Sequence, residues 1–112
     1  MKINLSDDRK ACFLVGYLAR RLVENNEKNN KYYKEKLLGI GGKINIDSFM
    51  RIYKWVVMND WDNGEHEELL IKTSELLLLN DERIRSLNVG YYYTLGFTSK
   101  KIEIDGDDII YK

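Results

Sequence analysis

The stretch FLVGYLARRL (Phe13–Leu22) decides the fold, because its apolar residues recur with the period of an α-helix. This helix is predicted to run from about Asp7 to near Asn26. Ser6 offers a side-chain oxygen to an exposed helix amide, and the two acids that follow it favour the positive end of the helix dipole. The apolar face is broader than a coiled-coil seam. We therefore predict a helix that is buried on more than one side.

The tripeptide Val-Gly-Tyr at 15–17 recurs at 89–91, inside the last predicted helix. A glycine in the middle of a helix costs about 1 kcal/mol relative to alanine, so it is tolerated mainly where two helix backbones approach closely. We interpret Gly16 and Gly90 as marks of a helix crossing in the core. An internal duplication is the sharper interpretation, but too few positions match to support it.

Apolar residues recur at helical spacing through most of the chain, and no proline interrupts them. This pattern predicts an all-α fold, a compact bundle of about five helices with short connections. A three-helix core with looser second and third segments is the alternative. After the first helix we expect a second helix at 30–38. A third helix is expected from Asp47, its N-cap, to about Asn59. A fourth helix follows a loop at 60–68, and a fifth runs from Asn80, its N-cap, to about Phe97.

The same spacing predicts which side chains face the core. In the last three helices these are Phe49, Ile52, Tyr53, Val56, Val57, Leu69, Leu70, Thr73, Leu76, Leu77, Ile84, Leu87, Gly90, Tyr91 and Leu95.

The two ends of the chain lack the helical pattern of the middle. Met1–Leu5 is a short lead-in. KIEIDGDDIIY (101–111) alternates apolar and charged residues around an Asp-Gly turn, which is typical of a β-hairpin, with a flexible tail as the alternative. A lone hairpin is marginal in water, so it is expected to dock on the bundle or on a partner. Residues 1–112 then form a single domain.

The formal net charge is zero, but the charges are distributed unevenly. Of the 18 Lys and Arg residues, 12 lie in 1–54, and of the 18 Asp and Glu residues, 12 lie in 55–112. A basic half can contact phosphates, whereas an acidic half can face basic proteins. The alternative is a solvated surface whose charges mix once the helices pack.

Catalytic and metal-binding signatures fail on inspection. The run GIGGK (39–43) lacks the spacing of a phosphate-binding loop, and the acids at 60–64 are out of register for calcium. His66 is the only histidine, and Cys12, the only cysteine, is expected to be a small buried apolar residue. We predict a non-enzyme with no cofactor or metal. One cysteine, no signal-like N-terminus and no long apolar run indicate a cytoplasmic protein without a membrane segment.

Basic and aromatic residues lie close together in the first half of the chain. Single-stranded nucleic acid is often held by a basic groove with planar side chains, although such tyrosines equally serve as packing residues. Tyr91, Tyr92 and Tyr93 must point around more than one side of their helix, so at least one is expected at an edge. The candidate phosphate contacts are Arg20, Arg21, Lys28, Lys31, Lys34, Lys36, Lys43, Arg51 and Lys54.

Two predicted helices carry short motifs of aromatic residues and glycine. The first has Phe13, Leu14, Gly16, Tyr17 and Leu18, and the last has Gly90, Tyr91, Leu95, Gly96 and Phe97. Over roughly residues 5–100 the chain thereby resembles the C-terminal helical region of the large subunit of type I-B CRISPR Cascade complexes. That region is itself similar to a separate small subunit of the same system.

The resemblance implies a non-catalytic small subunit of an RNA-guided surveillance complex, present in more than one copy. Its partners would be the backbone and large subunits, the guide RNA and the target DNA. A basic surface would stabilise the opened DNA, chiefly the displaced strand, while base pairing supplies specificity. Two alternatives stay open: a helical protein-protein interaction module, and a small helix-turn-helix regulator that reads duplex DNA.

Overall fold

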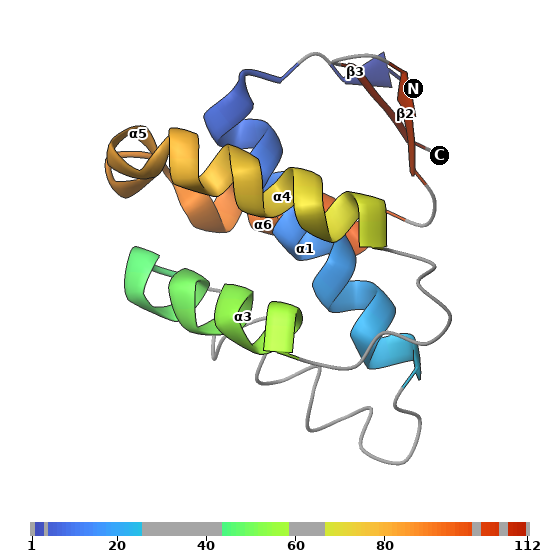
Figure 1. The fold of residues 1–112 in the computed structure, drawn as a ribbon, viewed down its shortest axis with the longest axis horizontal. Coiled ribbons are helices and arrows are strands. Elements are labelled where there is room, and N and C mark those ends of the chain that lie inside the picture. The colour runs from blue at the N-terminus through green and yellow to red at the C-terminus, as the bar shows by residue number, and fades with distance from the viewer. Residues whose placement is uncertain are drawn as a thin grey trace.

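The structure, a computed structural model, describes residues 2–3, 5–25, 44–58, 67–99, 102–105 and 108–111. The helix predicted at 30–38, the run at 39–43 and the acids at 60–64 lie outside the described residues. The described part contains the helices α1 (Asp7–Asn25), α3 (Ile46–Met58), α4 (Glu67–Leu79), α5 (Asp81–Arg85) and α6 (Val89–Thr98), and the strands β1 (Lys2–Ile3), β2 (Ile102–Asp105) and β3 (Asp108–Tyr111) (Figure 1).

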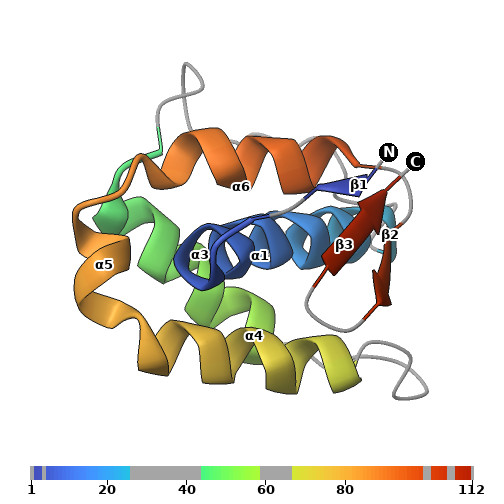
Figure 2. The same ribbon diagram turned by 90° about the horizontal axis from the view of Figure 1, so that it is seen from above.

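The bundle is organised around α1, as its broad apolar face predicts. Figure 2 shows α1 running between α6 on one side and α4 on the other, and α1 also contacts α3 and α5. Every residue from Lys10 to Ala19 is buried, and Phe13, Leu14 and Leu18 are completely inaccessible. The all-α prediction is confirmed, and so is the expectation that the first helix is covered on several sides.

The contact between α1 and α6 is a close approach of two backbones. A Cβ atom added at Gly16 would overlap the carbonyl oxygen of Tyr93 and lie 2.9 Å from the amide nitrogen of Phe97. The relation is reciprocal, because a Cβ atom at Gly96 would overlap the carbonyl oxygen of Phe13. Glycine is therefore required at both positions, since any side chain would push the helices apart.

The predicted crossing is confirmed for Gly16 but wrong for Gly90. Gly90 is half-buried and faces the segment before α3, where an added Cβ would lie 2.9 Å from the carbonyl oxygen of Ile44. The glycine that meets α1 is Gly96, six residues further along α6. The repeated Val-Gly-Tyr therefore does not occupy equivalent places, and Tyr17 is buried whereas Tyr91 is 58% exposed.

The helix starts differ from those predicted. Ser6 donates its hydroxyl hydrogen to Asp8, and it is Asp8 Oδ1 that accepts from the amide of Arg9, 3.0 Å away. The start of α3 is capped by Asn45, whose Oδ1 accepts from the Ser48 amide at 2.9 Å, while Asp47 lies inside the first turn. The first turns of α1 and α3 therefore still have a side-chain oxygen, supplied by a residue near the predicted one.

The helix predicted from Asn80 to Phe97 is two helices, because 86–88 interrupts it. The Ser86 hydroxyl donates to the carbonyl oxygen of Arg83 at 3.1 Å, a side-chain bond to the backbone that competes with helix continuation. Asn80 does not cap α5, since its amide nitrogen donates to the carbonyl of Leu76 at the end of α4. The change of axis turns Tyr93 into the core and Tyr91 out of it, against prediction.

The other predicted core positions mostly hold. Val57 is the exception in α3, where it is 37% exposed at the edge of the apolar face. Fully or partly buried as predicted are Phe49, Ile52, Tyr53, Val56, Leu69, Leu70, Thr73, Leu76, Leu77, Ile84, Leu87 and Leu95.

The C-terminal hairpin is confirmed, with β2 and β3 antiparallel and Asp105 paired with Asp108. The lead-in contributes as well, because Lys2 and Ile3 of β1 pair with β3 and complete a sheet of order β1-β3-β2. This brings the two chain ends together (Figure 1). The sheet docks on the bundle through Ile102, which is 9% exposed. None of the helices in the described ranges is both long and apolar enough to cross a membrane.

Replacing Gly96 with alanine tests the backbone contact. Alanine favours an isolated helix by about 1 kcal/mol, but here its Cβ has no room, so we expect Gly96→Ala to lower the free energy of unfolding by about 1–3 kcal/mol. Urea denaturation followed by circular dichroism measures the change. Thr94→Ala, on the exposed face of the same helix, is the control and should shift stability by no more than about 0.5 kcal/mol. A Gly96→Ala protein as stable as the control would contradict the close crossing.

Candidate nucleic-acid interface

The structure places four of the nine predicted phosphate contacts, and these fall into two groups. Arg20 and Arg21 lie near the end of α1, and Arg51 and Lys54 lie on α3. The other five, which are Lys28, Lys31, Lys34, Lys36 and Lys43, lie outside the described residues.

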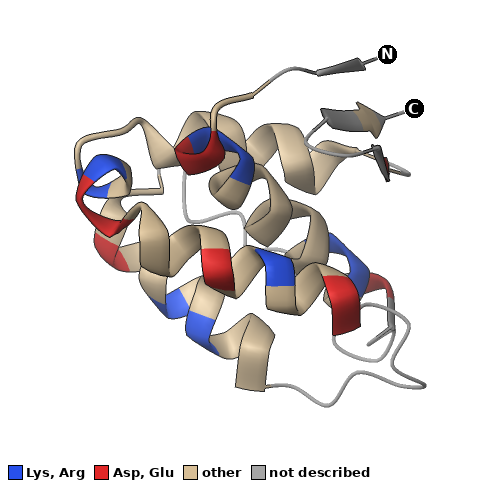
Figure 3. Ribbon diagram, turned by 45° about the horizontal axis from the view of Figure 1, so that its top comes forward, with Lys and Arg blue, Asp and Glu red and all other residues tan. Residues whose placement is uncertain are grey.

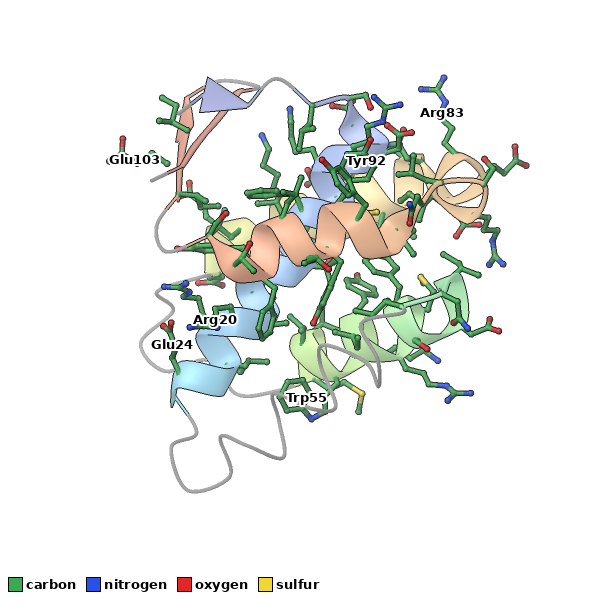
Figure 4. All side chains as sticks on the ribbon, turned by 180° about the vertical axis from the view of Figure 1, so that it is seen from behind. Arg20, Glu24, Trp55, Arg83, Tyr92 and Glu103 are labelled. Atoms are coloured by element: carbon green, nitrogen blue, oxygen red, sulfur yellow. The ribbon has the colours of Figure 1, made fainter. Side chains whose placement is uncertain are left out.

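The arginines of α1 are occupied by contacts within the protein. The carboxylate of Glu24, one turn further along α1, forms an ion pair with each arginine. Arg20 Nε lies 3.2 Å from Oε1 (Figure 4), and Arg21 Nη1 lies 3.3 Å from Oε2. The guanidinium of Arg20 also lies over the ring of Phe97, 5.5 Å from its centroid. Two positive charges share one carboxylate here, so the local charge available to a phosphate is reduced by about half.

Arg21 has a structural role that the sequence analysis missed. Its Nη2 donates to the carbonyl oxygen of Ser99 at 2.9 Å, and its guanidinium lies 4.7 Å from the centroid of the Tyr17 ring. Ser99 is the residue directly after α6, so this bond ties the end of α6 to α1. Because the residues that meet are 78 positions apart, no local pattern could have identified the contact.

The basic residues of α3 are in a different situation. Arg51 and Lys54 are exposed, and no carboxylate of the described residues lies within ion-pair distance of either. Figure 3 colours the basic positions of the described helices blue and the acidic positions red. Trp55 follows them, half-buried. Positions i, i+3 and i+4 share one face of a helix, so Arg51, Lys54 and Trp55 form a basic-aromatic face, here called the α3 face. Two exposed cations on one helix face, with no carboxylate partner in the described ranges, suit contact with a phosphate backbone.

The tyrosines of α6 separate into different environments, as predicted for three successive residues. Tyr93 is completely buried, while Tyr91 projects outward with its ring against the edge of Tyr92 at 5.0 Å between centroids. Arg9 lies over the Tyr92 ring at 5.5 Å from its centroid, a contact between distant parts of the chain that the sequence did not indicate. A groove beside Tyr91 is lined by Ile44, Asn45, Asn88, Gly90, Thr94 and Leu95.

Buried titratable groups in the core are unsuited to chemistry. Cys12 is completely buried, as expected, and burial raises the pKa of its thiol to about 12 from its ordinary value of 9.0. Burial also raises the pKa of Tyr93. Both groups are therefore protonated at neutral pH and closed to solvent. The described ranges contain no group of three His, Cys, Asp or Glu residues that could hold a metal ion.

Comparisons of the chain with protein-family models, with curated proteins and with solved structures give no significant match. The interpretation of the site therefore depends on its own geometry and on the motifs in the sequence.

The contacts of Arg21 predict a cost in stability when it is removed. Arg21→Ala should lower the free energy of unfolding by about 1–3 kcal/mol, because it leaves the Ser99 carbonyl without its charged donor. Arg20→Ala is the matched control, since Arg20 is more exposed and its contacts among the described residues are with Glu24 and Phe97, and it should cost less than about 1 kcal/mol. Urea titration of both variants measures the difference. Equal losses would contradict the structural role of Arg21.

The pKa of Cys12 predicts that labelling of the thiol reports unfolding. At pH 8 the native chain should react with a thiol reagent only as fast as it opens, and the urea-unfolded chain should react at once. The raised pKa also means that the burial of Cys12 stabilises the fold fully below about pH 9 and progressively less as the pH rises from 9 to 12. Equal labelling rates for native and unfolded protein would contradict the burial.

Proposed function

We propose that the chain is a non-catalytic helical subunit that contacts single-stranded nucleic acid through its α3 face. The observation that carries this proposal is the pair Arg51 and Lys54, which are exposed and have no carboxylate partner among the described residues. Cations on one helix face that have no carboxylate partner nearby attract phosphates. The contact would be independent of sequence, because phosphates carry no sequence information.

The assembly we propose for this subunit is an RNA-guided surveillance complex of the type I-B CRISPR Cascade kind, in the cytoplasm. The short glycine-aromatic motifs of α1 and α6 support this choice, and two of their glycines make the helix crossing. In such a complex the guide RNA supplies specificity by base pairing, and strand exchange is nearly balanced in energy. A few phosphate contacts to the displaced strand are then enough to favour the opened target.

The assembly is tested by purifying the tagged chain from its native host, then identifying bound proteins by mass spectrometry and sequencing bound RNA. Recovery of backbone and large subunits with repeat-derived guide RNA is the expected result. Recovery of the chain with no RNA would remove the surveillance complex from consideration, and binding by the α3 face would then be judged only from the following experiment.

The α3 face predicts a specific salt dependence of binding. Arg51→Ala combined with Lys54→Ala should flatten the slope of log K against log salt concentration by about 1.4 for a single-stranded oligonucleotide, since each lost phosphate contact contributes about 0.7. Fluorescence anisotropy at several salt concentrations gives the slope.

The matched control is Arg83→Ala combined with Arg85→Ala. It removes the same charge from α5, where Arg85 already pairs with Asp81 at 3.1 Å. Figure 4 shows Arg83 at the opposite end of the molecule from Trp55. The control should leave the slope nearly unchanged. Equal effects of the two double variants would show that only net charge matters and would contradict the site.

A further inference from the structure

The outer face of α4 exposes large apolar side chains that the fold does not use. Leu78 and Leu79 are each 81% exposed and Ile71 is 53% exposed. The opposite side of the same helix already supplies the core residues Thr73 and Leu77, so α4 is apolar on two sides. Isolated apolar residues on a surface are ordinary, but a contiguous apolar patch marks an interaction site.

The spacing of these residues fits a helical ligand. Ile71 and Leu78 are seven residues apart, so they lie on one face about 10.5 Å apart along the helix axis. Leu79, the last residue of α4, extends the apolar surface beside Leu78. Figure 2 shows α4 along the lower edge of the bundle with α1 above it, and no described helix lies below α4 in this view. An amphipathic helix presents apolar residues at this same interval of two turns.

The charges around the patch indicate the sign of the charge that a partner should carry. Glu67, Glu68 and Glu75 are exposed on α4, and none of them forms an ion pair with another described residue. Glu75 lies one turn from both Ile71 and Leu78. A shallow hollow beside Leu78 and Leu79 is also lined by Asp81, Glu82 and Arg83, and Asp81 is paired with Arg85 at 3.1 Å. Carboxylates therefore predominate around the apolar residues, with Lys72 of α4 and Arg83 as the neighbouring cations.

We propose that this surface, called the α4 face and made of Ile71, Leu78 and Leu79 with Glu67, Glu68 and Glu75, docks a basic amphipathic helix of a partner protein. Apolar residues of the partner at two-turn spacing cover the patch, and its Lys or Arg residues pair with the carboxylates. Phosphates are repelled by the same carboxylates, so the α4 face and the α3 face take different ligands. The inference does not depend on the proposed function.

A second copy of the chain fits the α4 face less well. If two copies paired through antiparallel α4 helices, the midpoint between Ile71 and Leu78 would lie next to Glu75, so the two copies of Glu75 would meet at the centre. Like charges placed opposite each other across an interface repel and disfavour that pairing. A basic partner removes this repulsion and turns it into attraction.

The test uses two synthetic helical peptides of about 18 residues with leucines at two-turn spacing. One carries lysines beside the leucines and the other carries glutamates. Binding to the full chain is measured by fluorescence anisotropy of the labelled peptide. The lysine peptide should bind at least tenfold more tightly than the glutamate peptide. Glu67→Gln combined with Glu75→Gln should reduce that preference.

Substitutions then locate the peptide. Leu78→Ser combined with Leu79→Ser should weaken binding of the lysine peptide at least tenfold, while Met58→Ser, which removes an equally exposed apolar residue from α3, should have no effect. Circular dichroism checks that both variants keep the fold. Binding of single-stranded oligonucleotide should be unchanged in the leucine variant, which separates this inference from the function of the α3 face.

Several results would overturn the proposal. Equal binding of the two peptides would remove the charge complementarity, and unchanged binding by the leucine variant would place the peptide elsewhere. Sedimentation velocity distinguishes the other occupant. If the chain forms dimers that Leu78→Ser abolishes, and the lysine peptide does not bind, the α4 face belongs to a second copy of the chain.

Discussion

The structure depends on the contact between the backbones of α1 and α6. Gly16 and Gly96 each lie against a carbonyl oxygen of the other helix, so the axes approach more closely than side chains would permit. The rings of Tyr93 and Phe97, one turn apart on α6, are stacked beside this contact with 5.9 Å between their centroids. Packing this close fixes the position of α6, and through it the places of Tyr91, Tyr92 and the end of the helix.

This contact determines how the cations of α1 are used. Because α6 ends beside α1, Arg21 can reach the Ser99 carbonyl and Arg20 can lie over Phe97, and Glu24 pairs with both. Both arginines therefore make contacts that stabilise the folded chain. Arg51 and Lys54 of α3, by contrast, have no carboxylate partner among the described residues. Helix α3 buries Phe49, Ile52 and Val56 and exposes both of these cations.

The two proposed surfaces divide the uneven charge of the sequence between different helices. The α3 face comes from the basic half of the chain and the α4 face from the acidic half. Tyr53 of α3 donates its hydroxyl to Ser74 of α4 at 2.9 Å, so the two helices are neighbours and yet present opposite charges. A subunit built in this way can hold nucleic acid with one helix and a basic protein with the next, without competition between them.

The helical class, the extent and deep burial of α1, the hairpin and the importance of Gly16 follow from the sequence alone, because helical and strand periodicities are local properties of the chain. Tertiary structure decided the rest. It selected Gly96 over Gly90 as the partner of Gly16, divided the last helix at 86–88 and added β1 to the hairpin. It also gave different environments to basic residues that look alike in sequence, because Arg21 contacts Ser99 and Tyr17 whereas Arg51 and Lys54 are exposed. Each of these outcomes depends on residues far apart in the chain that meet only after packing, and no local pattern records such a meeting.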